Sequence, residues 1–177
     1  EKDYSVFVNP FIGTGGHGHT FPGAVVPHGM IQPSPDTRID GWDACSGYYY
    51  EDSTINGFSH THVSGTGCCD YGDVLLMPTV GEQRYQTTDP QSQQLAYSSA
   101  FSHENETAEP GYYSVFLDTY QVKAEISATK RGAIHRYTFP ESSEAGFILD
   151  LDYSLQRQTN SDMGISGLIS LFADSRH

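Results

Sequence analysis

Positive charge is scarce in this sequence. Nine lysines and arginines stand against 22 aspartates and glutamates, which gives a net charge of −13 at pH 7. The basic residues form no cluster beyond Lys130-Arg131, so the chain lacks the positive surface that holds a phosphate backbone. We therefore expect no nucleic-acid partner.

Long apolar runs, helical periodicity and an even cysteine count are also missing. No stretch approaches the roughly 18 consecutive apolar residues of a transmembrane helix, so we expect no membrane span. No window shows a clean helical period with capping residues, so a helix-rich or βαβ architecture gains no support. The odd set of Cys45, Cys68 and Cys69 excludes a complete disulfide framework; a bridge from Cys45 to one of the adjacent pair and free thiols both stay open.

The chain does contain strand-length apolar segments separated by turn residues. The stretch YYSVFLDTYQVKAEISATKRGAIHRYTF predicts an antiparallel meander with a hairpin turn at 130–132. At 177 residues one domain is the default, so we predict a single antiparallel β-sandwich over 1–177. The predicted strands are Tyr4 to Val8, Asp73 to Met77, Tyr112 to Tyr120, Val122 to Ala128, Ala133 to Phe139, Gly146 to Leu151 and Gly164 to Phe172.

The N-terminal part of the chain differs, because glycine and proline interrupt almost every element between Asn9 and Gly72. A long irregular segment in a compact domain usually belongs to a binding surface or packs under another element. GTGGHG at 13–18 matches the G-x-G-x-x-G of dinucleotide-binding loops, but Pro22 and Pro27 stand where the phosphate-binding helix would have to follow. We therefore reject nucleotide binding. Farther along, SHENETAEPG at 102–111 is predicted to be a surface loop.

Histidines gather in this irregular segment as two H-x-H pairs, His17 with His19 and His60 with His62. Alternate side chains of an extended segment project from one face, so each pair could present two imidazoles together. Neutral imidazoles ligate metals, but no C-x-x-C or H-E-x-x-H partner accompanies them, and histidines in polar loops often only form hydrogen bonds. The second interpretation is favoured.

Trp42, the sole tryptophan, lies among turn residues in DGWDACSGYYYED. An indole in a loop offers a flat apolar face to a sugar ring and an N–H to a hydroxyl, while core packing is the alternative. Asp43 adds a carboxylate beside it. Downstream, Asp70 and Asp73 either bind sugar hydroxyls or cap turns, and we expect at least one of them to cap a turn.

Three stretches together resemble one enzyme family. VNPFIGTGGHGHTFPGAVVPHGMIQPSPDT, GWDACSGYYYEDSTINGFSHTHVSGTGCCDYGD and LLMPTVG are similar to the N-terminal region of the bacterial family-92 glycoside hydrolases, which are calcium-dependent exo-acting α-mannosidases. The resemblance runs from about Val8 to Gly81, and more loosely from Pro110 to about Asp152. That family joins an N-terminal β-sandwich to a much larger (α/α)6 helical barrel, with the active site between them.

The resemblance implies inverting hydrolysis of terminal α-mannosides, on mannose-terminated glycans such as N-glycans, by a secreted, periplasmic or cell-surface bacterial enzyme. In the family the general acid, the general base and most calcium contacts come from the helical domain. This chain is therefore implied to lack the catalytic acid and base, to be inactive alone, and to have the helical domain of the same polypeptide as a partner.

By motif position, the resemblance implies that Trp42 lines the terminal-mannose subsite. Lip or interdomain contacts are implied for His17, His19, Asp43, His60 and His62. Two alternatives stay open. A stand-alone carbohydrate-binding module would bind mannose without the barrel, and a purely structural interdomain scaffold would tolerate loss of Trp42.

Overall fold

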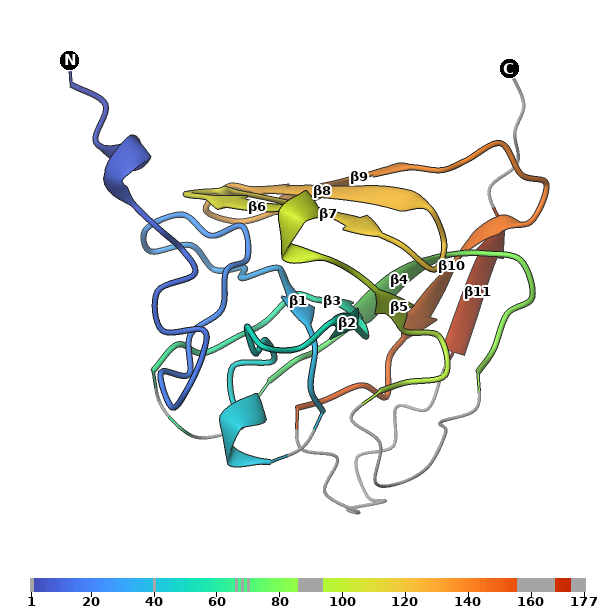
Figure 1. The fold of residues 1–177 in the computed structure, drawn as a ribbon, viewed down its shortest axis with the longest axis horizontal. Coiled ribbons are helices and arrows are strands. Elements are labelled where there is room, and N and C mark those ends of the chain that lie inside the picture. The colour runs from blue at the N-terminus through green and yellow to red at the C-terminus, as the bar shows by residue number, and fades with distance from the viewer. Residues whose placement is uncertain are drawn as a thin grey trace.

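The protein is built from antiparallel sheets that face each other as two layers (Figure 1). The computed structural model describes residues 2–39, 41–65, 67, 69, 71–85 and 94–155, and the backbone of the strand at 168–172. Strands and short 3-10 turns form all regular structure in these ranges, which confirms the predicted all-β sandwich. None of the helices in them is long and apolar enough to cross a bilayer.

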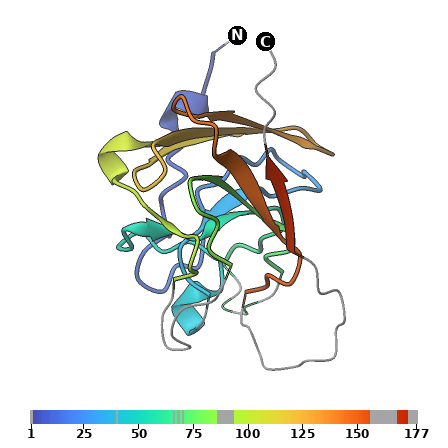
Figure 2. The same cartoon turned by 90° about the vertical axis from the view of Figure 1, so that its right-hand side faces the viewer.

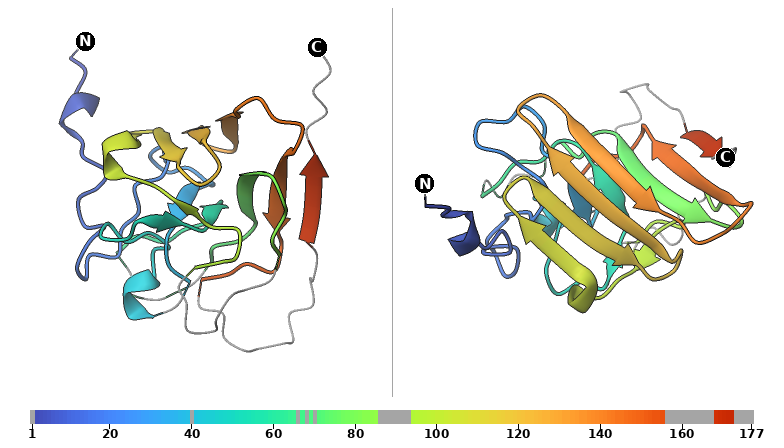
Figure 3. Two further views of the ribbon diagram at one scale, coloured as in Figure 1. Left: turned by 45° about the vertical axis from the view of Figure 1, so that its right-hand side comes forward. Right: turned by 90° about the horizontal axis from the view of Figure 1, so that it is seen from above.

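The first layer is a four-stranded meander in the order β6-β7-β8-β9, seen from above in Figure 3. Every second residue of its two middle strands is a buried apolar or aromatic side chain that belongs to the core. The predicted hairpin is present, with the amide of Thr129 donating to the carbonyl of Gly132 at 2.8 Å. The strands are β6 (Glu106–Glu109), β7 (Tyr112–Leu117), β8 (Val122–Ala128) and β9 (Ala133–Thr138).

The second layer is a five-stranded sheet in the order β1-β3-β4-β10-β11. β4 begins near the predicted start and continues through Pro78, which pairs with Phe147 of β10. β2 (Thr54–Ile55) and β5 (Ser99–Ala100) form a separate small ladder. The strands of the layer are β1 (Ser34–Asp36), β3 (Gly57–Ser59), β4 (Leu75–Val80), β10 (Ala145–Asp150) and β11 (Leu168–Phe172).

The core lies between the two layers, where side chains from both inner faces interdigitate. Burial of these apolar groups is the main term that holds the layers together. The four-stranded sheet contributes Tyr113, Val115, Leu117, Val122, Ala124 and Ile126, and the five-stranded sheet contributes Phe58, Leu75, Met77 and Ile148.

Two predictions about local structure are wrong. The segment from Tyr4 to Val8 is no strand. It contains the 3-10 turn η1 (Ser5–Phe7), because none of the described strands pairs with it and Asp3 accepts hydrogen bonds from the amide and hydroxyl of Ser5. The segment 102–111 is no plain surface loop, since it holds η3 (His103–Asn105) and the edge strand β6.

The glycine-rich segment at 13–20 folds back on itself as a tight loop, and no helix follows it. The amide of Thr20 donates to the carbonyl of Gly13, and Gly18 lies so close to Gly13 that an added Cβ would collide with the Gly13 carbonyl. This loop meets the 3-10 turn η2 (Trp42–Ala44), which Figures 1 and 2 place at the end of the molecule opposite the four-stranded sheet.

Candidate functional site

Trp42 is the centre of an aromatic cluster on the surface. It begins η2 and is 56% exposed, with the His17 ring 4.9 Å and the His19 ring 4.4 Å from its own centroid. Its indole N–H donates to the carbonyl of Gly67 at 3.0 Å. The expectation of a free N–H for a sugar hydroxyl is therefore wrong, and what Trp42 presents is an apolar ring in a fixed orientation.

Asp43 joins the two histidines of this cluster. Its Oδ1 lies 2.7 Å from Nδ1 of His17 and 3.5 Å from Nε2 of His19. The hydrogen bond from His17 lowers the pKa of Asp43, so this carboxylate is ionised at neutral pH. The structure thus brings together four of the six site residues that the sequence singled out.

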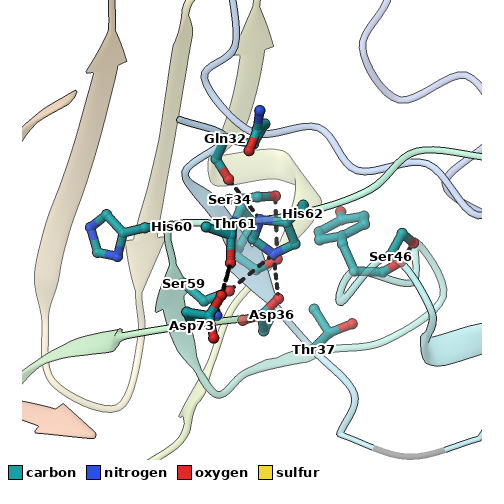
Figure 4. A network of polar contacts seen from close by, with 12 residues as sticks. Gln32, Ser34, Asp36, Thr37, Ser46, Ser59, His60, Thr61, His62 and Asp73 are labelled. Carbon is teal, nitrogen blue, oxygen red and sulfur yellow. Dashed lines mark hydrogen bonds and ion pairs between the residues drawn. The ribbon is translucent and has the colours of Figure 1, made fainter. Parts of the chain in front are cut away.

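His62 does not belong to this cluster. Its side chain is 0% exposed and lies between the carbonyl of Gln32, 2.7 Å from Nδ1, and Oδ1 of Asp36, 2.8 Å from Nε2 (Figure 4). The hydroxyl of Ser59 also lies 3.1 Å from Nε2. As a direct sugar contact His62 is out of reach because its side chain is fully buried, and the lip or interdomain contact implied for it stays a prediction.

His60 points away from His62 in Figure 4, because the segment after Ser59 is no longer a strand and the alternation rule does not apply to it. Its Nδ1 donates to the carbonyl of Val74 at 2.7 Å, and its ring lies 4.9 Å from that of His135 on β9. Burial lowers the pKa of His60, and burial lowers that of His135 to about 4.

Acid should weaken the fold through His135. Below pH 6.5 the unfolded chain binds a proton on His135 that the folded protein excludes. The contribution of the neutral His135 to stability is therefore fully present above about pH 6.5 and is lost as the pH falls toward 4. Across that pH range, protonation of this imidazole should lower the free energy of unfolding by about 2–3 kcal/mol. Urea unfolding at pH 6.5 and at pH 4 measures this loss in the unmodified chain and in His135→Phe, which cannot bind the proton. An equal loss of free energy of unfolding in both proteins would contradict the prediction.

Of the carboxylates downstream, Asp73 links two segments of the chain. It accepts the hydroxyl of Thr61 at 2.7 Å while its amide donates to the same oxygen at 3.0 Å, so its polar groups face Thr61, and the turn-capping role stays a prediction. Asp70 lies outside the described residues. Sequence reasoning missed Asp36 and the carbonyl of Gly67, and no local signal marks either, because each acquires its partner only through the tertiary fold.

Cys45 follows η2 as its C-cap, and its sulfur atom lies 2.8 Å from that of Cys69. We expect one molecule of oxidised glutathione to convert the two thiols to a protein disulfide, which releases two molecules of reduced glutathione. Thiol titration after unfolding should then find one thiol instead of the three in the sequence, and none in Cys68→Ser. Three thiols after oxidation, or a bridge that contains Cys68, would contradict this pairing.

Calcium does not suit the cluster around Asp43. Among the described residues, His17, His19 and Asp43 form the group of side chains whose donor atoms lie within 4.8 Å of one another. Calcium takes six to eight oxygen ligands, whereas this group offers two imidazole nitrogens and one carboxylate. The calcium that the resemblance implies therefore does not fit these residues.

Comparison with known proteins finds a matching family model and similar solved structures. Residues 7–170 match the family model "Glycosyl hydrolase family 92 N-terminal domain". A family GH92 α-mannosidase of Bacteroides thetaiotaomicron, solved in complex with mannoimidazole, is 44% identical with a TM-score of 0.81, over 85% of this chain and 20% of its own. An inverting GH92 mannosidase of the same organism is 31% identical with a TM-score of 0.68, over 85% of this chain and 20% of its own.

A secreted glycosidase of the fungus Arthroderma benhamiae is also similar, with 31% identity over 147 residues, which are 81% of this chain and 18% of that protein. The chain thus spans about a fifth of the length of these relatives. The family-model match over residues 7–170 includes the irregular segment with the Trp42 cluster and the strands β1 to β10. The chain belongs to the N-terminal domain family of glycoside hydrolase family 92.

Proposed function

We propose that this chain forms one side of the terminal-mannose subsite and the interdomain surface of a secreted, exo-acting, inverting α-mannosidase. The observation that carries the proposal is the exposed Trp42 ring. Two histidine rings and the Gly67 carbonyl hold it in place, so a sugar that stacks on it orders no flexible side chain. Membership of a family whose solved relatives are mannosidases supports mannose as the sugar.

The proposal also holds that the chain is inactive by itself. An inverting glycosidase needs an acid and a base whose carboxyl groups lie about 6.5–9.5 Å apart across the sugar. In the Trp42 cluster Asp43 is the one carboxylate among the described residues, and it is bonded to His17. The acid, the base and the implied calcium ion would then be held by the part of the enzyme that completes the cleft.

The test compares the isolated chain with the full-length enzyme that contains it. The chain alone, supplied with calcium and 4-nitrophenyl α-mannoside, should release no nitrophenol. In the full-length enzyme Trp42→Ala should lower kcat/KM by about 10- to 100-fold, since one stacking ring contributes about 1–3 kcal/mol. Ile134→Ala, at a residue 74% exposed on β9, is the control that should change nothing.

Each alternative gives a different result. Turnover by the chain alone would overturn its proposed inactivity. Tight binding of mannose by the chain alone, measured by calorimetry, would make it a stand-alone carbohydrate-binding module. Unchanged turnover in Trp42→Ala would make it a structural scaffold, with the cluster supporting the interdomain contact instead of the sugar.

A further inference from the structure

The cluster of His17, His19 and Asp43 has the composition and spacing of a transition-metal site. Its three donor atoms lie within 4.8 Å of one another. Zinc bonds of about 2.0–2.2 Å to nitrogen and oxygen place neighbouring tetrahedral ligand atoms roughly 3.3–3.5 Å apart. The 3.5 Å between His19 Nε2 and Asp43 Oδ1 already meets this spacing. The 2.7 Å between His17 Nδ1 and Asp43 Oδ1 has to open by less than 1 Å, which the 69% exposed His17 side chain leaves room for.

A second observation points to a ligand at the same place. The His19 side chain is only 6% exposed, and its Nε2 is buried without a hydrogen-bond partner among the described residues. Buried polar atoms are nearly always satisfied, so one that is left over and directed at a carboxylate needs an explanation. A cation between His19 Nε2 and Asp43 Oδ1 would supply it.

The surroundings hold the imidazole of His19 in this orientation. The edge of its ring meets the Trp42 ring at 4.4 Å, and Gly67 packs so closely that an added Cβ would lie 3.2 Å from its Nδ1. Packing of this kind around a ligand fixes ring orientation and supports metal affinity. Asp43 contributes a carboxylate oxygen that faces both imidazoles.

We propose that His17, His19 and Asp43 bind a first-row divalent cation of the zinc class. Two imidazoles and one carboxylate suit Zn²⁺, Co²⁺, Ni²⁺ or Cu²⁺, whereas Ca²⁺ and Mg²⁺ require oxygen ligands. Three protein ligands leave a fourth position open beside the exposed Trp42 ring. The site stands independently of the proposed sugar contact, since it rests on the donor atoms alone.

Trp42 provides the readout, because it is the only tryptophan and its ring touches both histidine rings. Cu²⁺ bound at the cluster should quench its fluorescence, so titration of the unmodified chain should give a saturable loss that ends at one equivalent. Zn²⁺ should reverse the loss by competition, and Ca²⁺ should not. Linear, unsaturable quenching, or no competition by Zn²⁺, would overturn the site.

Variants locate the ion. His17→Ala at an exposed residue leaves the packing in place and should weaken Cu²⁺ and Zn²⁺ binding at least tenfold. Asp43→Asn, of nearly equal shape, should do the same, whereas His28→Ala at an exposed histidine on another turn should bind as the unmodified chain does. Equal affinities in the three variants would show that the metal binds elsewhere. Sugar binding and turnover enter none of these measurements, so failure here would leave the proposed function standing.

Discussion

Replacing Glu106 with alanine is expected to lower the free energy of unfolding by about 3–5 kcal/mol, the loss typical of breaking a buried charge network. The Glu106 side chain is 0% exposed. Its carboxylate accepts from the hydroxyl of Tyr113 at 2.6 Å and from that of Tyr48 at 3.0 and 3.1 Å, and it lies 2.6 Å from Nδ1 of His103. Burial raises the pKa of both tyrosines, so both stay donors.

Removal of this carboxylate leaves the two phenol groups without an acceptor and Nδ1 of His103 without a partner. His103 has no freedom to turn elsewhere, because its Nε2 already donates to the carbonyl of Tyr50 at 2.6 Å and its ring stacks on Tyr50. Each unsatisfied buried group costs about 1–3 kcal/mol. The loss compares with the roughly 5–15 kcal/mol that stabilises a typical domain.

Urea denaturation gives the measurement for Glu106. Glu106→Gln keeps the side-chain volume and one acceptor oxygen, so its free energy of unfolding should fall by less than that of the alanine variant. Glu109→Ala, at an exposed residue of the same strand, should change the free energy of unfolding by less than about 0.5 kcal/mol. An alanine variant at Glu106 within about 1 kcal/mol of the unmodified chain would show that the network adds little.

The strands of the second half could be predicted because their pattern is local. In Val122–Ala128 an apolar residue occupies every second position, and the observed strand has the predicted bounds. The strands β1 and β3 could not be found this way. Ser34–Asp36 and Gly57–Ser59 contain residues that disfavour strands, and they are extended because they pair with each other and β3 pairs with β4.

The candidate site was predictable in composition but not in arrangement. The sequence marks Trp42 and the histidines as unusual, and the expectation that an H-x-H pair presents two imidazoles together is met by His17 and His19 but not by His60 and His62 (Figure 4). Gly18 and the positive φ of 52° at His19 make a loop, and tertiary contact with Asp43 brings His17 and His19 together. His60 and His62 follow the end of β3 and diverge, one toward β9 and the other toward β1.

The buried pair of Asp36 and His62 should prove as important to the fold as Glu106. Both side chains are 0% exposed. Because a carbonyl can only accept, the 2.7 Å contact with Gln32 places a proton on Nδ1 of His62, and Nε2 lies 2.8 Å from Oδ1 of Asp36. The two side chains therefore form a buried pair, and removing one partner leaves a buried polar atom of the other without its contact.

Asp36→Ala is expected to lower the free energy of unfolding by about 3–5 kcal/mol, measured by urea denaturation. Arg136→Ala is the control, since the Arg136 side chain is 72% exposed and its partner Glu125, 9% exposed, keeps its contacts with Tyr112 and Lys123, so we expect a loss of about 1 kcal/mol. A loss at Asp36 no larger than that at Arg136 would contradict the prediction.

The effect of Asp36 should extend to the site. The carboxylate of Asp36 packs against Gly47, whose φ of 81° and lack of a Cβ let the chain pass there, and the amide of Thr37 donates to the Gly47 carbonyl at 2.7 Å. The segment between these residues carries Trp42, so loosening the pair should free the indole from Gly67. Tryptophan emission of the folded variant should then shift to the red in Asp36→Ala and stay unchanged in Arg136→Ala. An unshifted emission would show that the pair stabilises the sheet without positioning the ring, because the indole reports on this turn alone.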